Sequence, residues 1–459
     1  MATQTVNTPV GQTKPIPHIQ EPPLIGSLPE HNRDRLNLYL RVARECGDVG
    51  IFHFGPYPLI LFNTSEFVHS ILVEHAYDFD KGELIHKTFR PVIGNGLFVS
   101  EGDLHRRQRK LMAPPFQPRH IKSYAASMVD YGERIQQEWK DESIVDIGQE
   151  MTHLTMSIVG KVLFDVDVFT ETDELGAAMV TTLGHVSRGL SSLFIVPLNW
   201  PTKHNKHTKQ AIALLRGRIQ RMIDERRSDA QQRNDFLSIL LQTRGEDGSR
   251  MDDQQISDEA LTLFGAGHET TATALTWTWY LLATHPDIYA KVQEEVGRVL
   301  QGRTPTYADL AHLPYCLQVF KETMRLYPPA YAVGRVALYD VKIDGYLVRK
   351  NGVAIVSPYT LHRRPDYFPD PEKFNPERFT PENEKQLPRY AYLPFGAGPR
   401  ICIGNHFAMM EGHLLLATLA QHVTFDLVPG QQIVPDPAQT VTIRPKYGMK
   451  MIVHRRKNN

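Results

Sequence analysis

The sequence has few cysteines, no excess of charge of either sign and no long apolar run. Three cysteines among 459 residues are too few for the disulfide framework of a small secreted protein, which favours a reducing, cytoplasmic compartment. Lys and Arg together number 51, as do Asp and Glu, so the basic excess of a protein held by nucleic-acid phosphates is missing. No stretch is long and apolar enough for a transmembrane helix. We therefore expect no integral membrane segment and no nucleic-acid partner.

The predicted elements are mostly helical. Residues 1–30 form a polar, proline-rich leader that we expect to be loosely ordered, and residues 31–459 form one domain. A β-hairpin is predicted over residues 51–62, and further short strands over 334–341 and 353–357. Apolar residues recur at helical spacing between them, with a long helix predicted over 257–285 and a last helix over 405–422. The predicted fold class is mainly α with small β-sheets.

A glycine-rich loop, FGAGPRICIG, occupies residues 395–404. Its glycines permit sharp turns and the close approach of a flat ligand. Cys402 lies just before the last helix, where backbone N–H groups and the helix macrodipole stabilise an anionic sulfur. A thiolate on haem iron favours O–O cleavage, so we predict that Cys402 is a metal ligand. The alternative is a small buried hydrophobic cysteine, which leaves the glycines and Arg400 without a purpose.

This loop resembles the cysteine-ligand signature of the cytochrome P450 family, the haem-thiolate monooxygenases. The resemblance extends over nearly the whole chain. It implies the family's fold, a triangular prism of helices around a buried haem b. It also implies a monooxygenase that inserts one atom of O2 into an apolar substrate. The matching positions in the loop are Phe395, Gly396, Gly398, Arg400, Cys402 and Gly404.

An acid and an alcohol interrupt the apolar helix predicted over 257–285. The free-energy cost of removing Glu269 and Thr270 from water there must be offset by hydrogen bonds to protein groups or to buried water. Thr270 follows Ala266 by four residues, so its hydroxyl can bond that carbonyl. The resemblance implies that Glu269 and Thr270 are catalytic and deliver protons. The alternative is that the Thr270 hydroxyl only bonds the backbone of its own helix and that the Glu269 carboxylate only has structural hydrogen-bond partners. His268 points away from Ala266, and we predict that it serves packing or lies at the surface.

Charged residues elsewhere match two further family features. Glu322 and Arg325, three residues apart on a predicted helix, can pair. With Arg378 they resemble the family's buried network, which implies a role in folding and haem retention. The two haem propionates need cationic partners. The resemblance assigns the cofactor site, with Phe395, to His105, Arg109, Arg335 and Arg400. Many relatives have tryptophan at the position of His105.

The sequence gives little information about the identity of the substrate. By resemblance, the pocket is lined by residues 79–98, 181–197 and 330–333 and by part of the central helix. A fatty acid, a terpenoid and a carotenoid are all compatible, although the hairpin segment 57–62 offers no arginine to capture a carboxylate. The residues that indicate an apolar guest are Phe89, Phe98, Phe194, Phe264, Ala266 and Val333.

Electrons are expected to come from a separate protein. The chain ends about fifty residues after the cysteine loop, too few for a flavin or iron–sulfur domain. We therefore expect a monomer that receives electrons from a ferredoxin or flavodoxin with its reductase, and uses NAD(P)H only indirectly. The basic residues Arg106, Arg107, Arg109 and Lys110 could dock such a partner, or form a solvated helix face.

Two other functions are compatible with a haem protein. A peroxide-driven peroxygenase or haem isomerase would not need the proton relay of Glu269 and Thr270. A noncatalytic haem sensor or carrier would more often bind iron through histidine. Both therefore fit the motifs less well than a monooxygenase.

Overall fold

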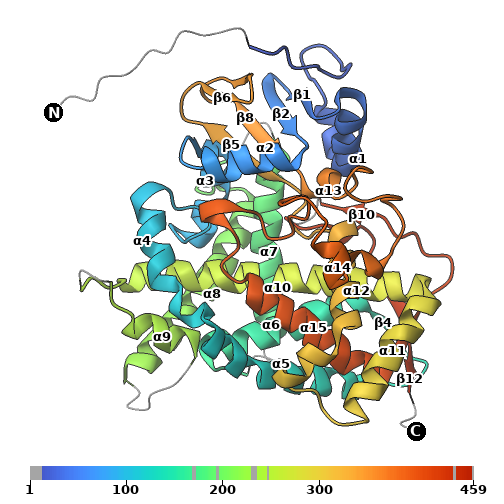
Figure 1. Cartoon of the computed structure of the whole chain (residues 1–459). Coiled ribbons are helices and arrows are strands. Elements are labelled where there is room, and N and C mark those ends of the chain that lie inside the picture. Colours follow the sequence, from blue (N-terminus) through green and yellow to red (C-terminus); the bar gives the residue numbers. More distant parts are fainter. Residues whose placement is uncertain are drawn as a thin grey trace.

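Helices dominate the chain, and the largest sheet lies at one end of the molecule (Figure 1). The computed structural model describes residues 13–167, 172–192, 196–228, 235–245, 248–437 and 441–456. The helices are α1 (Leu28–Cys46), α2 (Ser65–His69), α3 (Gly82–Ile93), α4 (Gly102–Met112), α5 (Pro118–Glu138), α6 (Ile147–Phe164), α7 (Thr172–Leu190), α8 (Lys203–Ser228), α9 (Phe236–Gln242), α10 (Asp253–Thr284), α11 (Pro286–Leu300), α12 (Pro314–Leu326), α13 (Pro358–Leu361), α14 (Pro381–Glu384) and α15 (Asn405–His422). The strands are β1 (Val49–Phe54), β2 (Tyr57–Phe62), β3 (Phe79–Asp80), β4 (Ile144–Asp146), β5 (Val333–Ala337), β6 (Val341–Ile343), β7 (Tyr346–Val348), β8 (Val353–Val356), β9 (Val423–Leu427), β10 (Pro435–Asp436), β11 (Arg444–Pro445) and β12 (Lys450–Arg455). The predicted fold class is confirmed.

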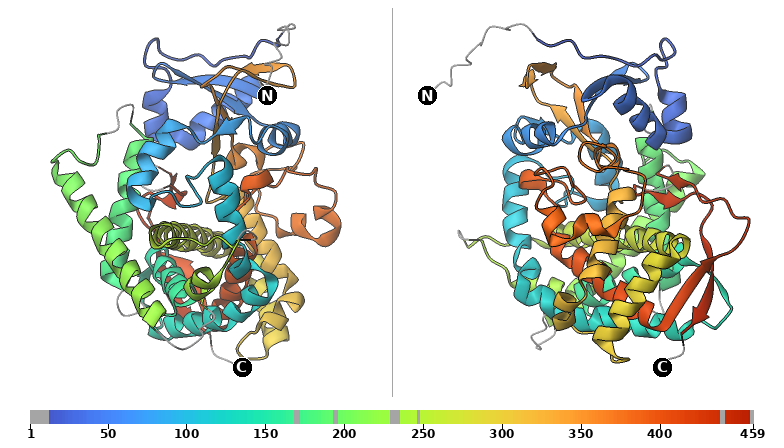
Figure 2. Two further views of the ribbon diagram at one scale, coloured as in Figure 1. Left: turned by 90° about the vertical axis from the view of Figure 1, so that its left-hand side faces the viewer. Right: turned by 45° about the vertical axis from the view of Figure 1, so that its right-hand side comes forward.

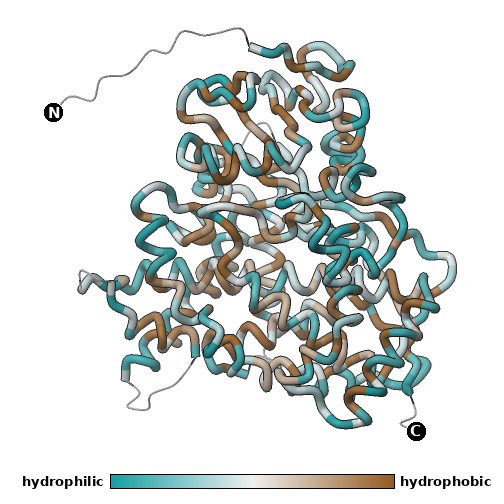
Figure 3. Tube along the Cα trace, in the orientation of Figure 1, coloured by the Kyte–Doolittle hydropathy of each residue, from teal (hydrophilic) through white to brown (hydrophobic). Residues whose placement is uncertain are grey.

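The largest sheet joins strands from the N-terminal part of the chain to strands from residues 333–356. Its strands lie in the order β1-β2-β8-β5-β3. The predicted hairpin is present, with β1 and β2 antiparallel and Ile51 opposite Ile60. Strand β8 pairs parallel to β2 and antiparallel to β5, which ties the hairpin to the segment that precedes the cysteine loop. Figure 3 shows hydrophobic and hydrophilic residues alternating along the helices below this sheet, as expected for helices that bury one face.

The proline-rich N-terminal segment differs from the prediction of a loose leader. From residue 13 onward it is ordered against the hairpin, and residues 1–12 lie outside the described residues. His18 bridges to Ile51, Ile19 is 1% exposed, and Gly26 bridges to Phe54. Proline fixes the backbone in an extended conformation that can lie along a strand edge, so a high proline content did not mean disorder here.

Helix α10 crosses the centre of the molecule, and other helices surround it in the end-on view (Figure 2). It begins four residues before the predicted start, because the Asp252 carboxylate caps it by accepting a hydrogen bond from the Gln255 backbone N–H at 2.7 Å. It ends at Thr284, next to Pro286, as the sequence indicated. Among the helices of the described part of the chain, none combines the length and apolarity needed to cross a bilayer.

A fully buried ion pair fixes α12 to the coil that leads to the cysteine loop. Both members, Glu322 and Arg325, are 0% exposed, and Arg325 donates to both Glu322 carboxylate oxygens at 2.6 and 2.8 Å. The other side of the guanidinium donates to the carbonyls of His362, Pro371 and Lys373 at 2.7–3.1 Å. Its five N–H donors thus each have an acceptor. The structure also brings Arg378 to 3.4 Å from Glu322, so the three predicted residues lie together.

Replacement of Arg325, whose planar guanidinium makes all these hydrogen bonds, is expected to lower the stability of the protein strongly. A lysine ammonium cannot make five hydrogen bonds in these directions, so Arg325→Lys leaves the Glu322 charge and buried carbonyls unpaired. We expect the free energy of unfolding to fall by about 3–5 kcal/mol, measured by urea unfolding. The control is Lys87→Gln, whose exposed partner Glu83 lies 2.7 Å away on α3, with an expected loss below about 0.5 kcal/mol. Equal losses for the two variants would contradict the assignment.

Candidate functional site

The cysteine loop is pressed against another segment of the chain. Gly396 and Gly398 have φ of +72° and +69°, the left-handed region that glycine adopts without strain. A Cβ at Gly398 would collide with the Leu72 carbonyl in the π-helical turn Ser70–Glu74. The Cys402 backbone N–H donates to the Phe395 carbonyl at 2.9 Å, which closes the loop just before α15. The glycines therefore fix the position of Cys402.

The Cys402 side chain combines accessible surface with strong desolvation, since surrounding protein removes bulk water. Burial raises the pKa of the Cys402 thiol, while the Gly404 backbone and the charge of Arg109 act in the opposite direction. A cation and a helix start next to a desolvated sulfur suit a thiolate that is held by a metal ion.

The middle of α10 opens onto an internal space. Ala266 is exposed and Thr270 is half-buried, in a helix whose other central residues are mostly buried. The Thr270 hydroxyl donates to the Ala266 carbonyl at 2.9 Å, as the four-residue spacing predicted. The hydroxyl oxygen keeps its acceptor capacity for a guest beside Ala266.

Glu269 is held by residues from the other end of the chain. The Thr442 hydroxyl donates to one carboxylate oxygen at 2.7 Å, and Arg444 forms an ion pair that includes a hydrogen bond of 2.8 Å. Burial alone would raise the pKa of Glu269, but Arg444, His268 and Thr442 hold it below its ordinary value. Arg444 is 25% exposed, so this pair connects the buried helix to the surface. No local pattern pointed to these partners, which follow Glu269 by more than 170 residues.

His268 and Phe264 lie on the other face of α10. His268 is 2% exposed and shares a hydrogen bond of 2.6 Å between its Nδ1 and the Phe264 carbonyl, which agrees with a packing role. Phe264 packs towards Phe164 of α6, with ring centroids 6.2 Å apart, and is 5% exposed. The structure thus places Phe264 in the core between helices, on the face opposite Ala266, and not beside the opening.

Buried cations converge near the cysteine loop, and their charges act on one another. Burial and the charges of nearby cations lower the pKa of His105 to about 4 and hold that of Lys81 well below its usual range. Burial also lowers the pKa of Arg335 to about 10. The sequence analysis missed Lys81, whose significance comes from neighbours far along the chain. We call this set the cation cluster: Lys81, Arg109, Arg335 and Arg400, together with His105, whose imidazole is neutral near pH 7.

Most side chains of the cation cluster form no ion pair with a described carboxylate. This holds for the side-chain nitrogens of Lys81, Arg109 and Arg335 in the described part of the chain, although the Lys81 backbone N–H donates to the Glu101 carboxylate at 3.0 Å. The Arg335 side chain donates only to the adjacent Gly334 carbonyl. Arg400 departs from this pattern, because it forms an ion pair with Glu101 of the loop before α4. Desolvated cations without counter-charges fit a ligand that carries two carboxylates, as the haem propionates would.

Of the other residues predicted to line the substrate pocket, the structure brings Phe89 and Phe98 together. The Phe89 and Phe98 rings lie with centroids 4.7 Å apart, and the Lys81 ammonium lies 3.9 Å from the centre of the Phe98 ring. Val333 is half-buried at the start of β5. Phe194 lies outside the described residues.

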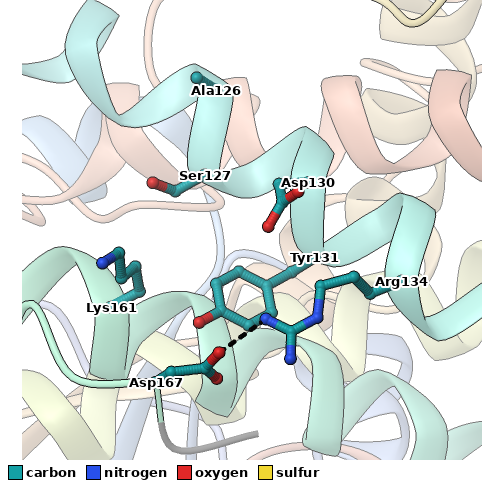
Figure 4. Close-up of a pocket in the computed structure, with 7 residues that line it drawn as sticks. All are labelled: Ala126, Ser127, Asp130, Tyr131, Arg134, Lys161 and Asp167. Carbon is teal, nitrogen blue, oxygen red and sulfur yellow. Dashed lines mark hydrogen bonds and ion pairs between the residues drawn. The ribbon is translucent and has the colours of Figure 1, made fainter.

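A polar hollow of about 360 Å³ opens elsewhere, beside α5 and the end of α6 (Figure 4). Arg134 and Asp167 pair there at 2.8 Å. None of the predicted site residues lines it, so it is separate from the candidate site. Its lining residues are Ala126, Ser127, Asp130, Tyr131, Arg134, Lys161 and Asp167.

A buried carboxyl group lies behind the site. Glu411 of α15 is 0% exposed, and neither of its oxygens has a hydrogen-bond partner among the described residues. Burial raises the pKa of Glu411 to about 8, and the nearby Thr271 hydroxyl of α10 partly opposes this. Glu411 is therefore mostly protonated and neutral near pH 7.

Comparison with known proteins identifies a family match and several relatives. The family model described as Cytochrome P450 matches residues 17–453. "Cyclooctatin synthase" from Streptomyces melanosporofaciens is 37% identical over 405 residues, which cover 87% of each chain. "Cyclooctat-9-en-7-ol 5-monooxygenase" from the same organism is 35% identical over 387 residues, 84% of each chain. "Pentalenene oxygenase" from Streptomyces avermitilis is 32% identical over 398 residues, 86% of this chain and 88% of the relative.

The buried Glu411 predicts a specific pH dependence of stability. In the unfolded chain a glutamate ionises near 4.5, whereas in the folded protein Glu411 keeps its proton to about 8. The folded state therefore loses stability as pH rises between these values. We expect Glu411→Gln, which cannot ionise, to remove about 2–3 kcal/mol of the fall in unfolding free energy between pH 5.5 and 8.

The measurement is urea unfolding of both proteins at the two pH values. Glu382→Gln, at an exposed position on α14, is the matched control and should leave the pH dependence as it is in the unmodified protein. The prediction fails if Glu411→Gln behaves like this control.

Proposed function

The chain belongs to the cytochrome P450 family, and on that premise we propose that it oxygenates a terpenoid. It is a haem-thiolate monooxygenase that uses O2 and a redox partner and acts on a lipophilic substrate. The observation that carries the terpenoid proposal is the chemistry named in its relatives. Cyclooctat-9-en-7-ol is by its name an unsaturated alcohol, and pentalenene an unsaturated hydrocarbon. The apolar pair Phe89 and Phe98 suits a guest of this kind.

Cys402 is the proposed haem ligand. Its fixed position before α15, its accessible surface and the nearby charge of Arg109 support this role. Haem held by a thiolate supplies reductive activation of O2, because the sulfur donates electron density that favours O–O cleavage. The three cysteines are all single thiols and none forms a C-x-x-C-H motif, which supports noncovalent haem b and a cytoplasmic location.

The cation cluster is proposed to hold the haem propionates. Arg335 and Lys81 are the strongest members, because their side chains are desolvated and form no ion pair with a carboxylate in the part of the chain that is described. Arg109 links this cluster to the sulfur, since its charge acts on Cys402. Arg400 and His105 complete the set, with Phe395 beside the cofactor. Anion binding would offset the desolvation of these groups.

Thr270 and Glu269 are proposed to handle protons. The Thr270 hydroxyl, held by the Ala266 carbonyl, can accept a hydrogen bond from a water or a protonated guest. Glu269 is ionised in its pair with Arg444, and the partly exposed Arg444 gives that pair access to solvent. When Glu269 leaves Arg444 it can take a proton at the surface side and pass it towards Thr270.

The electron donor is proposed to be a ferredoxin or flavodoxin, with NAD(P)H acting only through its reductase. Arg106, Arg107 and Lys110 are exposed on α4, the helix that also carries Arg109 of the cation cluster. Exposed basic side chains so near the cofactor site would attract an acidic protein. Such a transient partner suits an enzyme that acts as a monomer.

Replacement of Cys402 tests the ligand assignment. We expect Cys402→His to retain haem but to lose completely the strongly red-shifted Soret band of the reduced carbon-monoxide complex, since that band requires a thiolate. The measurement is the difference spectrum of the purified holoprotein. Cys46→Ser, at a half-buried position on α1, should leave the band unchanged. A red-shifted band in Cys402→His would refute the assignment.

Replacement of Thr270 tests proton delivery. We expect Thr270→Ala to divert electrons into peroxide and to lower product per electron roughly tenfold, because positioned proton transfer contributes about 100-fold or more to rates. Thr270→Ser keeps the hydroxyl and should restore most of the yield.

The matched control is Thr284→Ala, which removes an equivalent bond, 2.9 Å to the Tyr280 carbonyl, at the exposed end of the same helix. Product and peroxide are quantified against NAD(P)H consumed. An unchanged product yield in Thr270→Ala would show that protons arrive by another route.

A further inference from the structure

Arg35 of α1 is a buried cation that the proposed mechanism does not use. We propose that its guanidinium binds a carboxylate carried by the substrate, so that the guest is an acidic lipophile. This inference rests on the proposed function, because it concerns the same substrate pocket. A carboxylate on the substrate is not implied by the names of the relatives.

A break in α1 directs Arg35 into the protein. Asp34 has non-helical backbone angles, φ −154° and ψ 81°, and its carboxylate accepts a hydrogen bond from the Asn37 backbone N–H at 3.0 Å. Arg35 therefore stands in the first turn of the second half of the helix, and its side chain is 6% exposed. A cation at that end opposes the helix macrodipole, and burial adds a desolvation cost. Stability alone does not account for an arginine here.

The guanidinium joins two walls of the predicted pocket. One terminal nitrogen, Nη1, donates to the Tyr331 hydroxyl at 2.6 Å. The other, Nη2, donates to the Ser191 hydroxyl at 2.8 Å. Tyr331 belongs to the stretch 330–333 and Ser191 to the stretch 181–197, both of which the family resemblance assigns to substrate. Arg35 thus lies where these two segments meet.

The charge of Arg35 is incompletely matched. Its five N–H groups have two protein acceptors, both neutral hydroxyls, and Nε is buried without a partner in the described structure. No carboxylate of the described residues lies within 4 Å, although Asp436 of β10 is near enough for its charge to act on Arg35. Burial lowers the pKa of the neighbouring His31 to about 3, so this histidine is neutral.

Two other arginines show how the same chain treats a guanidinium that has only a structural role. Arg41, further along α1, is paired with Glu30 at 2.6 Å. Arg325 is fully buried, and all five of its donors have acceptors, including both oxygens of Glu322. Arg35 alone among these three has buried donor capacity left over.

A carboxylate is the ligand that best completes this arrangement. A planar carboxylate can accept two parallel hydrogen bonds from a guanidinium, and its charge offsets the burial of the cation. A hydroxyl supplies no charge, and a phosphate brings more negative charge than one arginine beside a neutral histidine balances. The hairpin offers no arginine for a substrate acid, but the fold supplies one from α1.

The test compares ligands that differ only in the charged group. The probes are geranylgeranoic acid, its methyl ester and geranylgeraniol, titrated into the holoenzyme at pH 7.5 while the low-spin to high-spin change of the Soret band is followed. We expect the acid to bind about 10- to 100-fold more tightly than the ester or alcohol, the ratio that charged hydrogen bonds provide.

Variants test whether Arg35 is the origin of the preference for the acid. Arg35→Gln should weaken binding of the acid by about 10- to 100-fold and change that of the ester less than threefold, whereas Arg35→Lys should keep part of the preference. Arg41→Gln, on the same helix, is the matched control and should bind the probes as the unmodified enzyme does. Thermal unfolding and the carbon-monoxide spectrum of each variant show whether it is folded and holds haem through sulfur.

The outcomes separate the two proposals. If the unmodified protein lacks the red-shifted carbon-monoxide band, the proposed function itself is refuted. If that band is present but acid and ester bind equally, or none of the probes shifts the spin state, the carboxylate inference is overturned. It is also overturned if Arg35→Gln weakens acid and ester alike, since Arg35 then only ties α1 to the residues just after α7 and just before β5.

Discussion

A cation buried in a protein needs a counter-charge, and this constraint organises the interior of the molecule. Where the chain supplies its own anion the result is rigid, as in the Arg325 and Glu322 pair with all five guanidinium donors satisfied. In the cation cluster, the side chains of Lys81 and Arg335 are desolvated and form no ion pair with a carboxylate of the described residues. These unpaired charges are the reason for the proposal that the propionates of the cofactor bind there.

Helix α10 separates structural and chemical roles by face. One face carries Phe264, which packs towards α6, and the buried His268, whose Nδ1 shares a hydrogen bond with the Phe264 carbonyl. The opposite face is opened at Ala266, where Thr270 turns its hydroxyl back to the helix. Glu269 lies between these faces and reaches Thr442 and Arg444 near the C-terminal end. A helix with a period of 3.6 residues can thus present core residues, an exposed position and the proposed proton-transfer residues within seven consecutive positions.

Features set by short sequence spacing could be predicted, and features set by long-range contacts could not. The hairpin, the last helix, the Thr270 bond to Ala266 and the pairing of Glu322 with Arg325 depend on neighbours within a few residues. The partners of Glu269 and the inclusion of Lys81 in the cation cluster depend on residues far along the chain. The order of the N-terminal segment was missed for the same reason, since only the folded hairpin provides the edge on which Ile19 packs.

Strand β5 relates the two places where positive charge is left over. Arg335 of the cation cluster lies within β5, and Tyr331, which binds Arg35, precedes the strand by two residues. Four residues of extended chain span at most about 14 Å, and pairing with β8 keeps this segment from moving. An acidic guest anchored by Arg35 would therefore be fixed at one end, at a set distance from the residues that hold the cofactor. The length of its apolar part would then decide which carbon lies beside Ala266 and Thr270. Such an arrangement controls the position of oxygenation through geometry, without a polar contact near the carbon that reacts.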